Sequence, residues 1–124
     1  MSDCVFCNID KSRIEIENDL ALSFKDLYPV TEGHTLVIPK RKVQSFFSLT
    51  QEEVTAMLEL LNSQKDALKN KDPLITGFNI GINDGEDAGQ TIMHCHIHLI
   101  PRRSGDMEDP RGGVRGVIPG KQSY

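Results

Sequence analysis

The alternation of residues 94–100 constrains the fold of this chain more than any other feature. The run His94-Cys95-His96-Ile97-His98-Leu99-Ile100 places histidine at every second position and small or apolar residues between. A period of two is typical of a β-strand, so the pattern predicts a strand with three imidazoles on one face and an apolar opposite face. Three of the four histidines of the chain lie here, so we expect the strand to line a functional cleft.

Three interpretations of this histidine run compete. A half-exposed strand whose polar face happens to be histidine is the least favoured, because threonine or lysine would serve as well. A metal could bind two of the imidazoles, but His94 and His98 would have Cα atoms ~13 Å apart in a strand that rises ~3.3 Å per residue. Nucleophilic catalysis uses all three, because one imidazole can attack while its neighbours hold the electrophile and handle protons.

Three segments together resemble the histidine triad family of nucleotide hydrolases and transferases. Residues 94–100 are similar to the motif His-φ-His-φ-His-φ-φ, in which φ is apolar. Residues 83–91 (NDGEDAGQT) resemble the loop that precedes the triad, and residues 33–40 (GHTLVIPK) resemble an earlier signature strand. The resemblance covers residues 4–101 in the same order, and it extends to the branches that cleave nucleoside phosphoramidates and diadenosine tetraphosphate.

The resemblance implies hydrolysis or transfer at the α-phosphate of a nucleoside substrate. His96 is implied as the nucleophile, which attacks through Nε2 while the backbone carbonyl of His94 holds the proton on Nδ1. His94 and His98 are expected to flank the phosphate, and His34 is expected to line the same cleft. Water then hydrolyses the phosphoramidate intermediate. No cofactor is expected for catalysis, because fixed hydrogen-bond donors can stabilise the developing charge.

The resemblance also implies contacts to the nucleoside. Asp26 matches a carboxylate that accepts hydrogen bonds from the ribose hydroxyls. The apolar residues implied for the base pocket are Val5, Phe6, Ile9, Phe24 and Leu27. A purely structural role is the alternative, with Phe24 and Leu27 in the core and Asp26 in a turn before Pro29. For Asp26 we favour the functional role, whereas the apolar residues can serve both.

The loop before the triad is expected to contact the phosphates. Gly85 and Gly89 would let backbone N–H groups approach a phosphate closely. The residues expected to bind substrate from this loop are Asn83, Gly89, Gln90 and Thr91.

The pair Cys4 and Cys7 has the spacing of half a zinc site or of a redox pair. No βαβ pattern surrounds it, so a redox role is disfavoured, and three cysteines in all make a disulfide framework unexpected. The resemblance implies a structural zinc bound by Cys4, Cys7 and His94. The fourth ligand, commonly histidine, is replaced by Lys42, whose ammonium has no lone pair, so zinc binding and its absence are equally open.

The order of predicted elements is β-β-β-α-β-β. We expect strands at residues 15–17, 20–25, 34–39, 77–83 and 94–100, the last ending at Pro101. A helix over residues 51–69 is predicted by a capping box at Thr50 and Glu53 and by an apolar stripe. The stripe residues are Val54, Met57, Leu58, Leu61 and Leu68. The fold class is therefore α+β, a five-stranded, mainly antiparallel sheet packed against one long helix.

Bulk properties limit the class of protein. The 124 residues form one domain (1–124), and the Gly- and Pro-rich residues 102–124 are expected to pack near the cleft or across a dimer seam. A net charge of -4 argues against a nucleic-acid partner, and no apolar run is long enough for a membrane span. We expect a cytoplasmic protein, and a homodimer because the resemblance implies pairing through the helix and a strand.

The sequence does not choose between phosphoramidates and dinucleoside polyphosphates as substrates, although a purine nucleotide is favoured. A nucleotide-binding or partner-binding module with vestigial activity is the alternative function. The complete triad, with Thr91 three residues before it, argues against that alternative.

Overall fold

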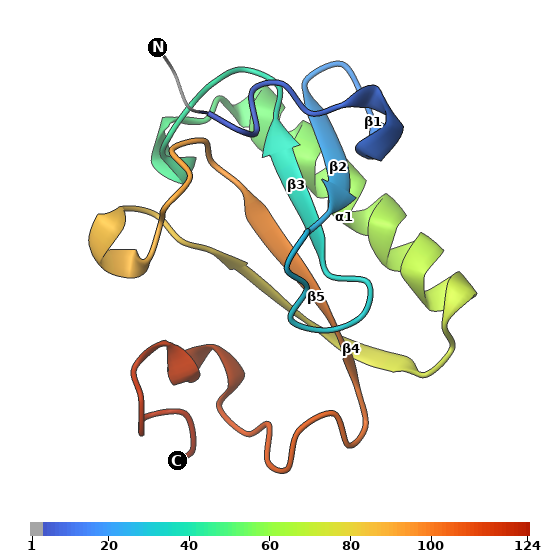
Figure 1. Ribbon diagram of the computed structural model, residues 1–124, viewed down its shortest axis with the longest axis vertical. Helices are drawn as coiled ribbons and strands as arrows, with labels where there is room; N and C mark the ends of the chain where they lie inside the picture. The colour runs from blue at the N-terminus through green and yellow to red at the C-terminus, as the bar shows by residue number, and fades with distance from the viewer. Residues whose placement is uncertain (1–3) are drawn as a thin grey trace.

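Five strands form a single antiparallel sheet in the order β1-β2-β3-β5-β4 (Figure 1). The computed structural model describes residues 4–124, so the first three residues of the predicted domain lie outside it. The strands are β1 (Ile14–Glu17), β2 (Ala21–Lys25), β3 (Thr35–Pro39), β4 (Ile75–Ile82) and β5 (Ile97–Arg103). The predicted element order and the α+β class are confirmed.

The strand that carries the triad begins later than predicted. β5 starts at Ile97 and continues through Pro101 to Arg103, so His94 and His96 lie in the segment before it. β3 pairs with β5 only from Ile97 to Leu99. Beyond Leu99, β5 has no hydrogen-bonded neighbour on its β3 side among residues 4–124. Pro101 lacks a backbone N–H, and it is tolerated because no partner on that side requires one. The prediction that Pro101 ends the strand is therefore wrong.

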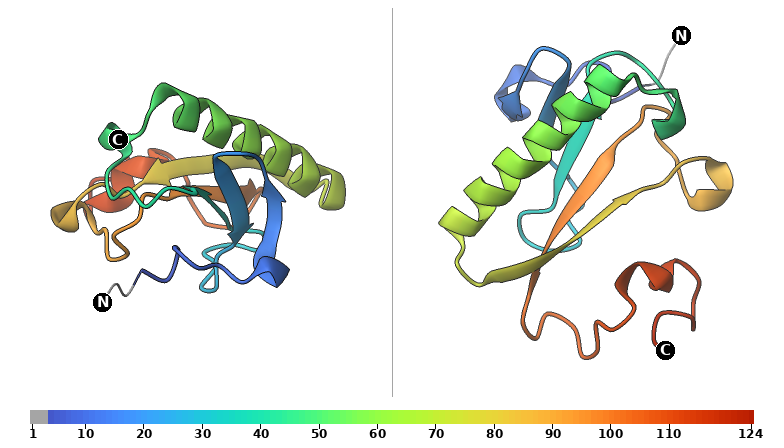
Figure 2. Two further views of the ribbon diagram at one scale, coloured as in Figure 1. Left: turned by 90° about the horizontal axis from the view of Figure 1, so that it is seen from above. Right: turned by 180° about the vertical axis from the view of Figure 1, so that it is seen from behind.

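The one α-helix within residues 4–124, α1 (Gln51–Lys71), covers one face of the sheet (Figure 2). The predicted capping box is present: Glu53 N–H donates to Thr50 Oγ1 at 3.1 Å, and Thr50 N–H donates to Glu53 Oε1 at 2.8 Å. The buried face differs from the predicted stripe, because Leu58 is 55% exposed. The buried residues are Glu53, Ala56, Met57, Leu60, Gln64 and Leu68.

Two buried polar residues explain the shifted face of α1. Glu53 accepts two hydrogen bonds from Arg41, at 2.8 and 2.9 Å, and Gln64 donates to Ser23 Oγ at 2.9 Å. Because a buried polar group that is fully bonded costs little, these residues can occupy positions that an apolar pattern assigns to solvent. The apolar stripe alone could not reveal that.

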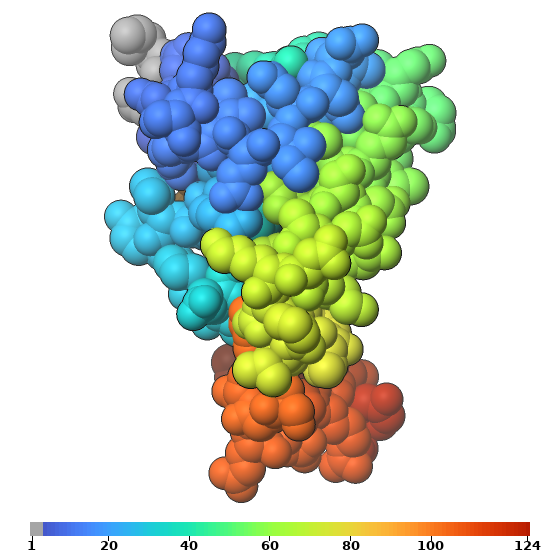
Figure 3. Space-filling model, turned by 90° about the vertical axis from the view of Figure 1, so that its right-hand side faces the viewer, coloured from blue at the N-terminus to red at the C-terminus, as the bar shows by residue number. Residues whose placement is uncertain are grey.

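His98 of β5 lies on the opposite face of the sheet, because its neighbours Ile97 and Leu99 pack with residues of α1. The N-terminal segment covers one part of this face, on the side away from α1 (Figure 2). Residues 104–124 form a lobe at one end of the molecule (Figure 3), and their short 3-10 helix η4 (Gly113–Val117) contacts β4. No helix among residues 4–124 is long and apolar enough to span a membrane.

Candidate active site

The His94 side chain lies apart from those of the other two triad histidines, whose rings are 5.1 Å apart between centroids. Its side chain is fully buried, Nε2 lies 2.8 Å from the carbonyl oxygen of Pro39, and Nδ1 lies 3.5 Å from the sulfur atoms of both Cys4 and Cys7. The expectation that the His94 imidazole flanks a phosphate is not met, because the residue precedes the strand whose alternation would have placed it there.

The residues expected to bind zinc lie together. The structure joins Cys4 and Cys7 by a disulfide, which the odd cysteine count did not predict. The ligand atoms of Cys4, Cys7 and His94 all lie within 4.8 Å of one another. Since Nε2 of His94 donates to Pro39, its Nδ1 lone pair points at the sulfurs, as it would for a metal held by the reduced pair. Burial lowers the pKa of His94, which favours the neutral, ligating form.

The middle histidine is held in one tautomer by the backbone. Nδ1 of His96 lies 2.8 Å from the carbonyl oxygen of His94. A carbonyl only accepts, so the proton of the neutral ring sits on Nδ1 and the lone pair sits on Nε2. The ring also contacts Phe6 edge-on, at 5.0 Å between centroids. His96 is therefore a fixed imidazole with a nucleophilic nitrogen.

A chain of three groups fixes His98. The Val30 N–H donates to Nδ1 of His34 at 3.0 Å, so the proton of His34 sits on Nε2. Nε2 of His34 lies 2.9 Å from Nδ1 of His98, which must therefore accept. The remaining proton of His98 is on Nε2. Among residues 4–124, this atom is the only buried side-chain nitrogen or oxygen without a hydrogen-bond partner.

Burial keeps these two histidines neutral near pH 7. It lowers the pKa of His98 to about 4, with the neighbouring His96 and His34 acting in the same direction. Burial also lowers the pKa of His34, and the Asp26 carboxylate, 3.5 Å away, opposes that shift. Neutral rings keep the donor chain intact, because a second proton on His98 would remove the acceptor that His34 needs.

An apolar cluster borders His96. Phe6 and Phe24 pack edge-to-face at 5.3 Å between centroids and lie with Leu36 and Ile38, and Ile9 packs against them. Phe24 is completely buried, so it belongs to the core as well as to the expected base pocket. Leu27 is 67% exposed and Val5 is also exposed, so neither is part of the cluster that the described residues form.

Asp26 joins the histidine cluster from the turn after β2. Its Oδ1 accepts the Tyr28 N–H at 2.8 Å, and its Oδ2 faces Nε2 of His34 at 3.5 Å. The turn role expected from the sequence is therefore present, and the carboxylate also lies beside His34, while its binding to ribose stays a prediction. Since a carboxylate can accept up to four hydrogen bonds, it retains acceptor capacity for ribose hydroxyls.

The loop before the triad differs from the expected phosphate cradle. The N–H groups of Gly85, Gly89 and Gln90 all donate within the loop. The buried Gln90 amide donates to the carbonyls of Gln44 and Ile92, which uses both of its protons. Gly89 and Gln90 therefore hold the loop in shape. Asn83 lines the cleft beside His98, and Thr91 is exposed at the end of the loop.

Several groups of the site could not be predicted from the type of residue at their position. The Val30 N–H and the carbonyls of Pro39 and His94 act through the backbone, and only the tertiary structure reveals them. The tail residues Val114 and Val117 also line the cleft at its outer end. Residues 102–124 were expected to pack near the cleft or across a dimer seam, and these two side chains lie at the cleft.

Comparison with known proteins agrees with this geometry. The HIT domain family matches residues 8–105. The nitrilase and fragile histidine triad fusion protein NitFhit of Caenorhabditis elegans is 42% identical over 102 residues, which are 82% of this chain and 23% of that protein. The asymmetrical bis(5'-nucleosyl)-tetraphosphatase of Schizosaccharomyces pombe is 37% identical over 98 residues, 79% of this chain and 53% of that protein.

A solved structure shares the fold as well. The Zn-bound histidine triad family protein from Mycobacterium smegmatis has a TM-score of 0.77 and 36% identity, and the alignment covers 86% of this chain and 80% of that one. The chain spans about a quarter of NitFhit and about half of the tetraphosphatase, so it corresponds to one part of each. With the match over residues 8–105, these findings establish that the chain belongs to the HIT domain family, whose members include nucleotide hydrolases.

Proposed function

We propose that this protein hydrolyses nucleotides at the α-phosphate through a nucleotidyl-His96 intermediate. The observation that carries the proposal is the 2.8 Å contact between Nδ1 of His96 and the His94 carbonyl, which leaves Nε2 free to attack. Substrates of two classes fit this chemistry: nucleoside phosphoramidates and dinucleoside polyphosphates. We expect the base, with a purine favoured, to lie beside the apolar cluster that includes Phe6 and Phe24.

The residues would share the work in two steps. In the first, Nε2 of His96 bonds to phosphorus as the bond from phosphorus to the leaving atom breaks, and the His94 carbonyl stabilises the positive charge that develops on the ring. The Nε2–H of His98 donates to a non-bridging phosphate oxygen. The leaving phosphate departs as an anion, whereas a leaving amine takes up a proton from solvent. In the second step, water attacks phosphorus and releases a proton to solvent, the electron pair of the phosphorus–nitrogen bond returns to Nε2, and the nucleoside monophosphate leaves with His96 neutral again.

The test is a substrate panel combined with a trapping experiment. Adenylated amines and dinucleoside polyphosphates are assayed, and the protein is quenched during turnover for intact mass measurement. We expect an adduct of one nucleotidyl group that is stable in base and lost in acid, as phosphoramidates are.

His96→Ala is the matched control. It should abolish the adduct and lower kcat by a factor of ~10⁴ or more, as removal of other catalytic nucleophiles does. An adduct on Thr91, or near-full activity of His96→Ala, would refute the mechanism. Nucleotide binding without turnover of any substrate would favour a binding module with vestigial activity instead.

We also propose a structural zinc on reduced Cys4 and Cys7 together with His94. The orientation of the His94 ring supports this, since its Nδ1 faces both sulfurs. Elemental analysis of protein prepared with reductant should find about one zinc per chain, and Cys7→Ser should lose it. Removal of the metal by a chelator should lower the midpoint temperature of thermal unfolding. The metal-free protein should still turn over substrate at temperatures where it is folded. Wild-type protein without metal would disprove zinc binding.

A further inference from the structure

The segment that carries Cys4 and Cys7 reaches the nucleophile by two routes. Phe6 lies between the two cysteines, and its buried ring contacts the His96 ring edge-on, with centroids 5.0 Å apart. The second route is His94, whose Nδ1 lies 3.5 Å from both sulfurs and whose carbonyl holds Nδ1 of His96. A change in the bonding of the two sulfurs therefore takes place one residue away from the groups that position the nucleophile.

The disulfide does not satisfy the buried His94 ring. Nε2 of His94 donates to the Pro39 carbonyl at 2.8 Å, so the neutral ring has its lone pair on Nδ1. Neither sulfur of a disulfide carries a proton, so the two atoms that face this lone pair have no hydrogen to donate. A thiol S–H is a donor, although a weak one. The reduced pair therefore gains a hydrogen bond that the disulfide lacks, which favours reversible opening of the covalent bond.

Of the three cysteines, only the members of this pair are open to a dissolved thiol reagent. Cys7 is exposed and Cys4 is half-buried, whereas Cys95 is buried, and burial raises the pKa of its thiol to about 11. The thiolate is the reacting form in thiol–disulfide exchange, so Cys95 is inert near pH 7. Cys7 is therefore the expected first point of attack.

Opening the disulfide moves the side chain between the two cysteines. Residues 4–9 belong to no helix or strand of the described chain, so no sheet ladder fixes their backbone. Two thiols cannot remain within bonding distance, so their sulfurs separate at least to van der Waals contact, and Phe6 moves with them. Phe6 packs on Phe24 in the apolar cluster beside which we expect the base to lie. The state of the pair is thus coupled to the nucleoside side of the site.

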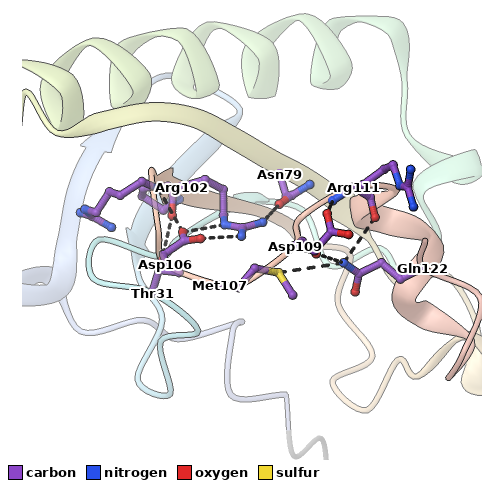
Figure 4. A network of polar contacts seen from close by, with 10 residues as sticks. Thr31, Asn79, Arg102, Asp106, Met107, Asp109, Arg111 and Gln122 are labelled. Carbon is purple, nitrogen blue, oxygen red and sulfur yellow. Dashed lines mark hydrogen bonds and ion pairs between the residues drawn. The ribbon is translucent and has the colours of Figure 1, made fainter. Parts of the chain in front are cut away.

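The tail is held by a separate network of hydrogen bonds. Arg102 binds the Asp106 carboxylate through two bonds, at 2.7 and 2.8 Å, and Asn79 through a third at 2.7 Å (Figure 4). No residue from 4–9 takes part in these three bonds. A change at the cysteine pair should therefore alter the nucleoside side of the site and leave the tail in place.

We propose that Cys4 and Cys7 form a reversible thiol–disulfide switch that tunes nucleoside binding through Phe6. The disulfide fixes Phe6 beside His96 before a nucleotide arrives, whereas in the dithiol form the side chain must be ordered on binding. The His94 carbonyl holds His96 in both forms, because the His94 ring keeps its own bond to a carbonyl of β3. The switch rests on the nucleotide binding of the proposed function and adds its regulation.

The oxidant of this switch is a low-molecular-weight disulfide, such as oxidised glutathione. The Cys7 thiolate attacks one of its sulfurs, which forms a mixed disulfide and releases one thiol. The Cys4 thiolate then attacks the Cys7 sulfur, which closes the protein disulfide and releases the second thiol. Two electrons pass from the protein pair to the reagent, and the two protons of the protein thiols end on the two released thiols. An excess of reduced thiol reverses both steps.

The test measures binding and turnover in both redox states. The protein is equilibrated with glutathione at high and at low ratios of oxidised to reduced form, with a chelator that keeps zinc out of the comparison, and alkylation with mass analysis counts the free thiols. The disulfide form should bind AMP about two- to tenfold more tightly by calorimetry, the range that the cost of immobilising one side chain gives. KM of a cleaved substrate should shift by the same factor while kcat stays nearly constant, as for a change in uniform binding.

Variants separate the cysteine pair from the side chain through which it acts. The double variant Cys4→Ser, Cys7→Ser keeps side chains of similar size but cannot form the bond, so it should bind AMP with the affinity of the dithiol form in both buffers. Phe6→Leu should still form the disulfide, but its affinity for AMP should no longer depend on the redox state. Cys95→Ala is the matched control, because it removes the one other thiol and should keep the full response.

Several results would contradict the switch. They are a pair that stays reduced in oxidised glutathione, equal AMP affinity of the two forms, a response that persists in the serine variant or in Phe6→Leu, or a response lost in Cys95→Ala. A protein that binds AMP with the expected redox response but cleaves no substrate of the panel would refute the hydrolase function and support the switch.

Discussion

His98 is positioned by a neighbour that need not touch substrate. Its Nε2 carries a proton only while Nδ1 accepts from His34, and His34 can donate only while the Val30 N–H occupies its other nitrogen. His34→Phe keeps a ring of similar size but removes the donor. The His98 ring could then adopt the other tautomer, which has no proton on Nε2.

We expect His98→Ala to lower kcat by a factor of ~10²–10³, as loss of one transition-state donor does, and His34→Phe to lower it by about tenfold with little change in KM. The double variant should be no slower than His98→Ala, because His34 acts through His98. If the two single losses multiply in a double-mutant cycle, His34 acts independently and the chain of donors is incorrect.

The same two histidines make stability depend on pH. An unfolded histidine titrates near 6.5, whereas burial lowers the pKa of His34 and lowers that of His98 to about 4. Between these values the unfolded chain binds more protons than the folded one, so the free energy of unfolding falls as pH falls from about 7 toward 4. Each such histidine contributes up to ~1.4 kcal/mol per pH unit in this window.

Urea unfolding at several pH values between 7.5 and 4.5 measures this dependence. His34→Phe should show a shallower slope than the wild-type protein, whatever its stability at neutral pH. An identical slope would mean that His34 is not neutral in the folded protein.

The sequence could not predict where two of the expected site side chains point, those of His94 and Gln90. The orientation of His94 depends on Cys4 and Cys7, about 90 positions away, and on a carbonyl of β3. The alternating pattern of residues 94–100 carries no information about contacts with residues so far away in the sequence. Gln90 is similar: its amide was expected to meet a phosphate, but neighbouring carbonyls take both of its protons.

At the scale of elements, α1 begins at an N-cap residue, Thr50, whose contribution to the free energy of unfolding can be measured. Thr50 Oγ1 accepts the Glu53 N–H, and the Arg41 guanidinium lowers the pKa of Glu53 to about 2. We expect Thr50→Ala to lower the free energy of unfolding by ~1 kcal/mol, because it leaves an N–H group of the first turn unpaired. Denaturant unfolding at pH 7 measures the loss.

Thr55→Ala is a suitable control for the cap. Thr55 is exposed within the same helix, where alanine has the higher helix propensity, so this variant should be neutral or slightly more stable. Equal destabilisation by the two changes would show that the capping bond contributes nothing.

The existence and order of the helix and strands could be predicted from local sequence patterns. The buried face of the helix and the ends of the strands could not. The capping box and the alternation in β2 and β4 are local signals, and their elements formed where expected. Leu58 fitted the apolar stripe, yet it is exposed because Glu53 and Gln64 occupy the buried face with bonded polar groups. β5 ran past Pro101 because its neighbour β3 had already ended.

At the scale of the molecule, we propose a homodimer. β4 is an edge strand of eight residues that pairs only with β5 within the described chain, and an unpaired strand edge is a surface that a second copy can cover. Ile80 on this strand is 54% exposed, and Leu58 on α1 is similarly exposed. These residues agree with an interface through the helix and a strand.

Light scattering at micromolar concentration should give the mass of two chains, and Ile80→Lys should shift it toward one. Leu20→Lys, at the turn between β1 and β2 near the other edge of the sheet, should leave the mass unchanged. A mass of one chain for the wild-type protein would rule out the dimer.

The division between the sheet and the tail has a consequence for how the protein tolerates change. The reacting nitrogens are held by β3, β5 and backbone carbonyls, whereas the outer wall of the cleft is a terminal segment with its own internal bonds. A change in residues 104–124 can therefore reshape the cleft without disturbing the backbone carbonyl that holds His96, so we expect variants of this segment to keep Nε2 of His96 in place.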